Sequence, residues 1–408
     1  MKKKKIFNDP VYGFITIPSE LILSLIDHPF FQRLRRIRQL GLSDFVYPGA
    51  LHTRFHHALG AMHLMSLVLD NLRGRDIPIS DQEYEASQIA ILLHDIGHGP
   101  FSHSLEFNLL HNVSHEELTK LLFHHLNQQL DGQLTLAEKI FNGQYKRKFF
   151  HQLVSSQLDI DRLDYLRRDS FFTGVSEGTI GSDRIIKMLI VKNDQVLVEE
   201  KGIYSIENFL NARRLMYWQV YLHKTSLSAE QMLVQIIKRA KDLIQEQTKL
   251  VINYPLEPFI TNKIDLNTIR GSHYLEAFAR LDDYDIWTAI KSWVRNPDKV
   301  LSTLCQLLLD RKLFKIDLTN QKVNKNKKKK LARILKSAFN LDERELSYFL
   351  VEGSISNAAY LRKDQSINIF TKEGAIVDIA QASDLPNIKA LSKIVKKYYL
   401  CWPKSVSL

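Results

Sequence analysis

An apolar stretch that leads directly into a string of histidines is the feature that most restricts how this 408-residue chain can fold. Residues 86–93 are apolar enough for a buried helix, and residues 94–103 add three histidines, an aspartate, two glycines and a proline. A buried helix that ends in ionisable side chains must open into a polar pocket, because unpaired charges are costly in a core. The glycines allow the backbone to turn sharply, so we expect the histidines to return to one pocket.

Two histidines and two carboxylates form the predicted metal set. His94 and Asp95 end the apolar helix, His57 lies near the start of a helix expected over residues 54–73, and Asp161 lies in a later acidic helix. Imidazole nitrogens with carboxylate oxygens suit a divalent ion such as Mg, Mn, Fe, Zn or Ni. A lone His-Asp pair is more often part of a satisfied core, but the other histidines and acids nearby favour a metal site.

Three further histidines surround this set. His98, His103 and His115 can donate hydrogen bonds to phosphate oxygens or protonate a leaving oxygen. Glu106 lies one helical turn after His103, where its carboxylate would orient that imidazole and raise its pKa. This equipment suits metal-assisted hydrolysis of a phosphate ester. It is poorly suited to redox chemistry or acyl transfer, and the sequence has neither a nucleophile elbow nor a P-loop.

The charge and the cysteines limit the partners. The net charge of +11 favours anionic partners, either nucleotide phosphates or nucleic acid, and does not choose between them. Within it, the basic run Lys325–Lys330 is interpreted as a solvated face or a phosphate contact. Cys305 and Cys401 form no disulfide framework and suit a reducing compartment. No apolar run approaches the length of a membrane span, so we expect no membrane partner and a cytoplasmic protein.

The pattern of the chain predicts a mainly α-helical fold, with a helical bundle followed by a C-terminal helical lobe that carries a small β-sheet. Ser19 and the Ser114–Glu117 capping box mark two helix starts. Other expected elements are helices over 29–40, 54–73, 82–95 and 325–339, a β-hairpin over 188–199, and β-like runs at 358–361, 367–370 and 376–379. The basic helix over 29–40 is either a solvated face or an anion contact. We expect two domains, residues 1–235 and 236–408.

Four segments together resemble the HD-domain phosphohydrolase superfamily, and most closely its deoxynucleoside triphosphate triphosphohydrolases. They are Arg54-Phe55-His56-His57-Ala58-Leu59-Gly60, the string from His94 to His103, Ser114-His115-Glu116, and Asp161-Arg162-Leu163-Asp164-Tyr165. The resemblance covers roughly residues 5–230. It implies an HD helical bundle that hydrolyses a deoxynucleoside triphosphate to deoxynucleoside and triphosphate.

The resemblance also implies roles for single residues. His57, His94, Asp95 and Asp161 would hold the metal, and His103 with Glu106 would form an acid dyad at the 5′ oxygen. His98 and His115 would contact the phosphates, together with Arg54, Arg162 and Arg213. The sugar and base would meet Gln39, Tyr165, Asp169 and Tyr221.

A second set of residues matches positions where relatives bind a guanine nucleotide as an activator between subunits. These residues are Lys5, Asp27, Gln32 and Arg35, in the N-terminal regulatory segment. Such a site implies a homo-oligomer, either a dimer or a tetramer. Two alternatives stay open: an HD phosphohydrolase of another nucleotide or phosphate monoester, and a nucleotide-sensing or nucleic-acid-binding regulator. Nucleic acid is compatible with the charge but not required.

Overall fold

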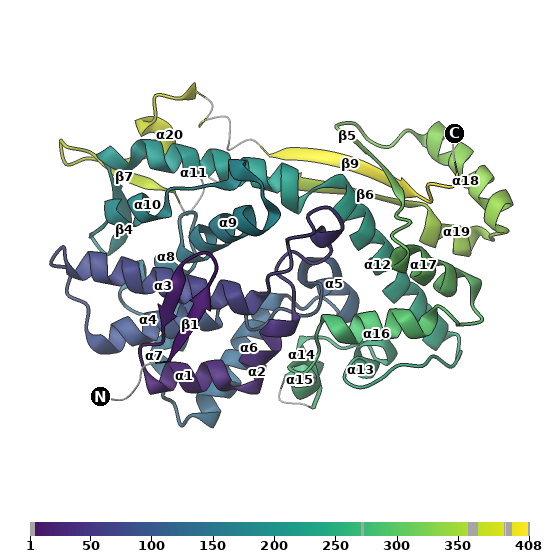
Figure 1. Cartoon of the computed structure of the whole chain (residues 1–408), viewed down its shortest axis with the longest axis horizontal. Coiled ribbons are helices and arrows are strands. Elements are labelled where there is room, and N and C mark those ends of the chain that lie inside the picture. The colour runs from purple at the N-terminus through teal and green to yellow at the C-terminus, as the bar shows by residue number, and fades with distance from the viewer. Residues whose placement is uncertain (1–4, 271–272, 358–365, 387, 389–393, 407–408) are drawn as a thin grey trace.

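Helices make up most of the chain, as the sequence predicts. The computed structural model describes residues 5–270, 273–357, 366–386, 388 and 394–406. Most helices of residues 20–173 gather on one side of the molecule and those of residues 257–349 on the other, while α5 (Ser102–Leu109) packs against α12 (Lys224–Gln245) (Figure 1). Helix α12 runs unbroken past residue 235, and one hydrophobic core includes residues from both groups. The division into two domains at that residue stays a prediction.

Side-chain caps fix where several helices of the first group begin. Ser19 accepts a backbone N–H at the start of α1, and Ser114 with Glu117 closes a capping box on α6, both as predicted; Ser80 and Glu83 cap α4 in the same way. The helical elements of this group are α1 (Glu20–Asp27), α2 (Pro29–Gln32), η1 (Arg33–Arg36), η2 (Ser43–Phe45), α3 (Arg54–Arg73), α4 (Asp81–Leu93), α5 (Ser102–Leu109), α6 (His115–Gln129), α7 (Thr135–Phe141), α8 (Lys148–Val154) and α9 (Ile160–Thr173).

The predicted helix over residues 29–40 is wrong beyond its first turns. Helix α2 covers one turn, and the 3-10 turn η1 extends it by another. After this turn, the Ile37 carbonyl accepts the Arg54 N–H and the Gln39 N–H donates to the His52 carbonyl, so the backbone leaves the helical path. This basic stretch is not simply a solvated face, because Arg33 is fully buried. The Arg33 guanidinium donates hydrogen bonds to the backbone carbonyls of Ile96, His98 and Leu281.

The predicted hairpin over residues 188–199 is confirmed as the antiparallel pair β3 (Leu189–Lys192) and β4 (Gln195–Glu199). Strand β4 pairs in parallel with β7 (Asn368–Phe370), and β7 pairs antiparallel with β8 (Ile376–Asp378). The two later β-like runs are therefore strands, as predicted. They extend the early hairpin instead of forming a sheet of their own, because β7 satisfies the backbone groups of the β4 edge. The run at 358–361 lies outside the described residues.

A second sheet and an N-terminal hairpin were not predicted. Strand β9 (Val395–Trp402) lies between β5 (Lys315–Thr319) and β6 (Val351–Asn357), and both pairings are antiparallel. At the other end of the chain, β1 (Ile6–Asp9) and β2 (Gly13–Thr16) form a hairpin that packs beside α3 (Figure 1). The first and last strands thus belong to different sheets.

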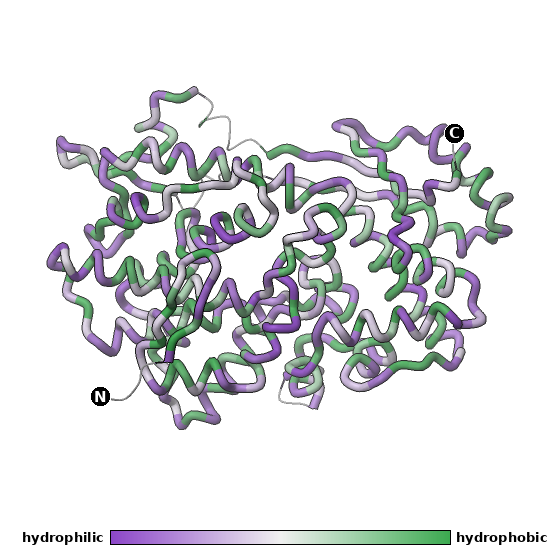
Figure 2. The backbone as a smooth tube through the Cα atoms, viewed as in Figure 1, coloured by the Kyte–Doolittle hydropathy of each residue, from purple (hydrophilic) through white to green (hydrophobic). Residues whose placement is uncertain are grey.

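In the remaining helices, hydrophobic and hydrophilic residues alternate at short intervals along the sequence (Figure 2). Such alternation gives each helix one face for the core and one for solvent. The elements are η3 (Ser176–Gly178), α10 (Ser182–Met188), η4 (Glu200–Gly202), α11 (Ile203–Met216), the π-helical turn η5 (Tyr217–Tyr221), α13 (Glu257–Thr261), α14 (Leu266–Ile269), α15 (His273–Phe278), α16 (Asp283–Trp293), α17 (Lys299–Leu309), α18 (Lys325–Phe339), α19 (Glu343–Phe349) and α20 (Ile379–Ala382).

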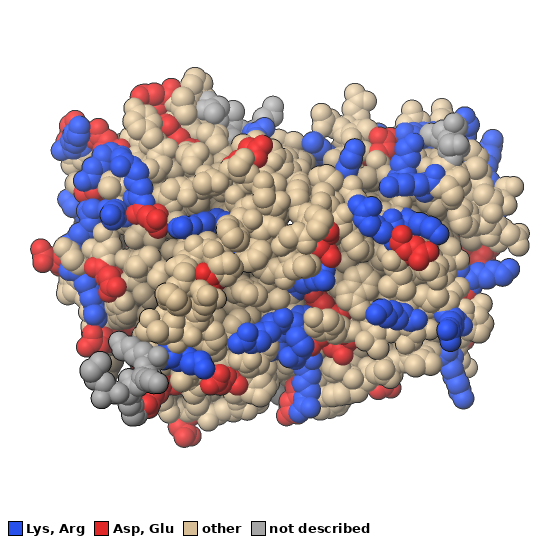
Figure 3. All heavy atoms as spheres, viewed as in Figure 1, with Lys and Arg blue, Asp and Glu red and all other residues tan. Residues whose placement is uncertain are grey.

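Helix α18 confirms the predicted helix of the basic run and shows how part of its charge is balanced. Three of its lysines form ion pairs with acidic residues of neighbouring elements, namely Lys327–Asp317, Lys328–Glu352 and Lys336–Glu343. On the face seen in Figure 3, lysines and arginines are scattered among acidic and other residues and form no single patch. Neither observation distinguishes a solvated face from a phosphate contact.

Among the described residues no helix has the length and apolar character needed to cross a membrane. Cys305 and Cys401 are both buried free thiols, in keeping with the absence of a disulfide framework from the sequence.

Candidate active site

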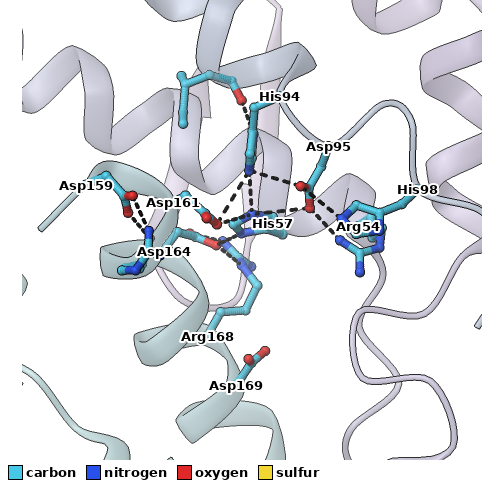
Figure 4. Close-up of polar contacts among 12 residues, drawn as sticks. Arg54, His57, His94, Asp95, His98, Asp159, Asp161, Asp164, Arg168 and Asp169 are labelled. Atoms are coloured by element: carbon cyan, nitrogen blue, oxygen red, sulfur yellow. Dashed lines mark hydrogen bonds and ion pairs between the residues drawn. The ribbon is translucent and has the colours of Figure 1, made fainter. Parts of the chain in front are cut away.

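The N-terminus of α3, the C-terminus of α4 and the N-terminus of α9 bring the four predicted metal ligands together (Figure 4). The Nε2 atoms of His57 and His94 lie 3.3 Å apart, and Asp161 Oδ1 lies 3.2 Å from the first and 3.5 Å from the second. Asp95 Oδ1 lies 3.3 Å from His94 Nε2, and its Oδ2 lies 3.8 Å from His57 Nε2. His57, His94 and Asp161 each offer a donor atom within 4.8 Å of the others, a group that could hold a metal ion, and Asp95 lies beside it next to His94.

The electrostatics of this group favour a bound cation. Burial lowers the pKa of His57, but hydrogen bonds to Asp161 and Asp164 raise it to about 10. Burial likewise lowers the pKa of His94, and Asp95 and Asp161 raise it. The carboxylates thus raise the pKa of both buried rings, which means that they favour positive charge at this point. A divalent ion would supply that charge on the same nitrogen and oxygen donors, so the residues fit a metal ion.

Hydrogen bonds on the far side of each imidazole fix how the ligand rings are turned. His57 Nδ1 lies 2.7 Å from Asp164 Oδ2, and His94 Nδ1 lies 2.6 Å from the carbonyl oxygen of Ile91. A proton on Nδ1 in each ring leaves the Nε2 lone pair facing the shared point, which is the usual arrangement behind a histidine ligand. Sequence analysis missed Asp164 as an orienting residue, because the alternating charges of α9 resemble an ordinary solvated helix face.

The three further histidines lie beside Asp95. His98 Nε2 is 3.3 Å from Asp95 Oδ1, and the His98 ring stacks on His115 with a centroid distance of 3.9 Å. The His103 ring lies 5.4 Å from His98 and 5.5 Å from His115, and its side chain is 74% exposed. Asp161 is also partly exposed, so solvent reaches the site from the side of Asp161 and His103.

Glu106 bonds to a different histidine from the one the sequence predicts. Its Oε1 lies 2.7 Å from His115 Nδ1 and also accepts the His115 backbone N–H at 2.7 Å. Its Oε2 is 4.0 Å from His103 Nδ1, which is too far for a hydrogen bond. The expected orientation of His103 by Glu106 is therefore not found. The cause is the start of α6, where the backbone N–H of His115 competes for the carboxylate. The expected rise in the pKa of His103 is wrong as well, because desolvation and the charge of Arg54 lower it to about 4 despite the opposing effect of Glu106.

Gly97 places the histidines through close packing and not through a left-handed turn. A Cβ at this position would lie 2.2 Å from Thr119 N and 2.3 Å from the His115 carbonyl oxygen. The Thr119 hydroxyl also accepts the Gly97 N–H and donates to the His94 carbonyl. The expectation that the glycines supply a sharp turn needs correction, because the left-handed residue of this loop is Phe101, with φ of 47°.

The predicted phosphate-binding arginines all contact acidic or amide oxygens near the site. Arg54 Nη1 donates to Asp95 at 2.5 Å and Arg54 Nε donates to Ser102, while Arg162 pairs with Asp159. Arg213 Nη1 donates to the amide oxygen of Gln157 at 3.0 Å.

Among the residues predicted to meet the sugar and base, Asp169 is buried with both carboxylate oxygens in use. Tyr221 Oη donates to Asp169 Oδ2 at 2.8 Å, and His52 Nε2 lies 2.7 Å from Asp169 Oδ1. Tyr165 and Tyr221 pack edge to face at 6.0 Å. His52 carried no signal in sequence analysis, because a single histidine in a loop has no motif.

Several of these residues keep buried polar atoms without a hydrogen-bond partner within the described part of the chain. They are Gln39 Oε1, His98 Nδ1, Arg162 Nε and Arg213 Nε. Buried polar atoms are nearly always paired in folded proteins, so each unpaired one needs an explanation.

Three of the four predicted activator residues, Asp27, Gln32 and Arg35, lie close to one another. Arg35 Nε donates to Gln32 Oε1 at 2.8 Å, and the Arg35 guanidinium lies 3.5 Å from the centroid of the Phe55 ring. Burial lowers the pKa of Arg35, and the nearby charge of Asp27 raises it. The Lys5 carbonyl accepts the Ile17 N–H at the end of the hairpin.

The chain is similar to HD-domain proteins along most of its length. Residues 54–169 match the HD domain, and residues 180–253 match the HD associated region. The solved structure of a phosphohydrolase from Bacteroides thetaiotaomicron VPI-5482 shares 51% identity and a TM-score of 0.95, over 98% of this chain and 100% of that one. The uncharacterised protein YwfO of Bacillus subtilis is 33% identical over 94% of this chain and 88% of its own. The chain belongs to the HD-domain phosphohydrolase family.

A relative with a more specific name matches over a shorter length. The deoxynucleoside triphosphate triphosphohydrolase SAMHD1 homolog of Dictyostelium discoideum is 30% identical over 61% of this chain and 52% of that protein. The chain thus spans about half of this relative.

Proposed function

We propose that this HD-domain phosphohydrolase hydrolyses deoxynucleoside triphosphates to deoxynucleoside and tripolyphosphate. The observation that carries the proposal is the set of unpaired buried polar atoms on Gln39, His98, Arg162 and Arg213. Three of these four side chains are donors or ring nitrogens suited to phosphate oxygens, and they accompany the metal set. The name of the Dictyostelium relative supports the same substrate class.

A bound divalent ion would polarise a phosphoryl oxygen and lower the pKa of a water molecule at the His57, His94, Asp95 and Asp161 cluster. The chain's own residues do the rest. Arg162 and Arg213 hold the triphosphate by charge-assisted hydrogen bonds. The Glu106 carboxylate keeps the Nδ1 proton of His115 directed at itself, so His115 Nε2 is the free ring atom. His103, exposed at the solvent side, donates the proton to the departing 5′ oxygen.

The test is a panel of all dNTPs and NTPs, incubated with the full chain and Mg²⁺ or Mn²⁺. We expect deoxynucleoside and intact tripolyphosphate, separated by ion-exchange chromatography and identified by phosphorus NMR. Products containing pyrophosphate or orthophosphate would contradict the cleavage position. Equal turnover of ribonucleotides would contradict the substrate class.

We also propose that a guanine nucleotide activates the enzyme by binding at Lys5, Asp27, Gln32 and Arg35 in a homo-oligomer. Asp27, Gln32 and Arg35 offer an acceptor, an amide and a donor within one short segment, which suits the edge of guanine. An isolated surface Asp and Arg contribute at most about 1 kcal/mol to stability, so stability alone gives little reason for their presence.

A further inference from the structure

A buried chain of charged side chains connects the N-terminal hairpin to the metal ligand His57. Asp164 Oδ2 contacts His57 Nδ1 at 2.7 Å, and Arg168 grips Asp164 with two hydrogen bonds, from Nε at 2.9 Å and from Nη2 at 3.0 Å. The remaining Nη1 of Arg168 donates to Asp9 Oδ2 at 2.8 Å. Asp164 and Arg168 are completely buried, and Asp9 is 5% exposed (Figure 4 shows the inner part).

Asp9, the outermost of these charged side chains, is held by backbone N–H groups of the hairpin turn. Asp9 ends strand β1, and its Oδ1 accepts the N–H groups of Val11 and Tyr12 at 2.9 and 3.0 Å. The hairpin turn and the Arg168 contact therefore use the two oxygens of one carboxylate. A shift of the turn must move Asp9 Oδ2, and with it the guanidinium that holds Asp164.

Close packing leaves the side chains of Arg168 and Asp164 little room to move. A Cβ at Gly60, on the neighbouring α3 helix, would lie 2.0 Å from Arg168 Nη2 and 2.1 Å from Asp164 Oδ1. The ring of Tyr12 covers the other side, 5.5 Å from the guanidinium carbon of Arg168. A guanidinium without one of its carboxylates would have to find new partners in a closed, dry space.

We propose that Asp9 and Arg168 are positioning residues for the metal centre: the hairpin holds Arg168, Arg168 holds Asp164, and Asp164 turns His57 toward the ion. This inference rests on the proposed metal-dependent function, but it concerns only the affinity and geometry of the metal site. Asp164 lies two contacts from the ion and acts through the orientation of the ligand, and the loss of such a partner typically weakens metal binding by about 10–100-fold. Arg168 and Asp9 lie one and two contacts further out, so we expect smaller effects from their replacement.

The test uses Co²⁺ added to the metal-stripped full chain, because its visible absorption reports ligand geometry. Asp9→Asn keeps the Oδ1 acceptor for the hairpin turn and removes the charge opposite Arg168. The matched control is Asp183→Asn, which removes the exposed partner of the adjacent Arg167 on the same helix. We expect Asp9→Asn to stay folded by circular dichroism, to bind Co²⁺ more weakly than the wild type by at most about 10-fold, and to show a changed absorption spectrum. The control should match the wild type.

Wild-type Co²⁺ affinity and spectrum in a folded Asp9→Asn variant would overturn the proposal, even if its melting temperature fell. If Asp9→Asn does not fold, Arg168→Lys takes its place, since it keeps the charge but loses the two-pronged grip on Asp164. If neither variant folds, the contacts from Asp9 to His57 serve only to stabilise the fold, and the proposal is also overturned. The expected Co²⁺ results, together with a wild type that leaves every dNTP intact, would support the positioning role and remove the proposed substrate.

Discussion

The Glu106 carboxylate holds His115 by hydrogen bonds and leaves His103 without one. It accepts two hydrogen bonds from His115, one from the ring and one from the backbone, while the His103 ring lies exposed beyond its reach. A histidine that donates a proton to a leaving group must reach the substrate, whereas one that contacts phosphate profits from a fixed ring. In the proposed reaction, His115 is the phosphate contact that Glu106 holds, and His103 is the acid that Glu106 does not hold.

A double-mutant cycle tests this separation. We expect His103→Ala to lower kcat by about 10²–10⁴, the usual share of a general acid, with little change in KM. The effects of Glu106→Gln and His115→Ala should overlap, because they remove the same interaction, while those of Glu106→Gln and His103→Ala should add. Steady-state kinetics of the three single and two double variants measure this. Additivity for Glu106 with His115, and overlap with His103, would restore the dyad expected from the sequence.

The residues that carry chemistry could be predicted because their types occur in a dense motif at fixed spacing. His57, His94, Asp95 and Asp161 lie together as the sequence suggests. Their orienting partners could not be predicted. In the sequence, Asp164 looks like any other charged residue of a helix. Asp9 lies more than a hundred residues away, and only the folded structure links the two through Arg168.

Helix α3 depends on a glycine for packing. An alanine within a helix ordinarily stabilises it by about 0.5–1 kcal/mol relative to glycine. At Gly60 the added Cβ would clash with Arg168 and Asp164, because it would lie well inside van der Waals contact with both. Such overpacking costs about 1–3 kcal/mol. We expect Gly60→Ala to lower the free energy of unfolding and to weaken metal binding.

Gly74, at the end of the same helix, provides the control. A Cβ there meets its nearest atom, the Asp70 carbonyl oxygen, at 3.4 Å, an ordinary contact. Gly74→Ala should leave the unfolding midpoint in urea unchanged or slightly raised. A Gly60→Ala protein as stable as Gly74→Ala, with unchanged metal affinity, would show that the space at residue 60 is not critical.

The start of α4 gives the fold a pH dependence. Burial raises the pKa of Glu83, but hydrogen bonds from Ser80, Tyr145 and Arg147 lower it to about 2. Because the folded pKa lies below the usual value near 4.5, ionised Glu83 stabilises the fold above pH 5, and this contribution is lost as the pH falls toward 2. We expect Glu83→Gln to cost about 1–3 kcal/mol at pH 7 and much less at pH 3. Urea unfolding at both pH values measures the difference, and an equal cost at both would contradict the assignment.

Capping motifs and periodicity predicted α1, α3, α4, α6 and α18 well, because these signals are local. The elements that sequence analysis missed depend on distant partners. The arginine-rich stretch leaves the helical path because residues 37–39 bond with residues 52–54, and β9 becomes a strand between β5 and β6. Pairing of this kind is set by tertiary structure and leaves no local pattern.

Across the whole molecule, the proposed activator segment and the metal centre lie on the same helical bundle. A guanine nucleotide that binds the active assembly better than the inactive one must shift the population toward it. We expect GTP to raise turnover of dTTP and to stabilise the oligomer in sedimentation experiments. Arg35→Ala should abolish both effects and keep basal turnover. Full activity on dTTP alone, unchanged by guanine nucleotides, would remove the regulatory proposal and leave the catalytic one intact.

The central claim, that water attacks the α-phosphorus and the 5′ oxygen leaves, is tested most directly by isotope labelling. Hydrolysis of a dNTP is run in H₂¹⁸O with the full chain and Mn²⁺, and both products are analysed by mass spectrometry. The account predicts one ¹⁸O atom in tripolyphosphate and none in the deoxynucleoside. Label in the deoxynucleoside, or in a released pyrophosphate or orthophosphate, would contradict it.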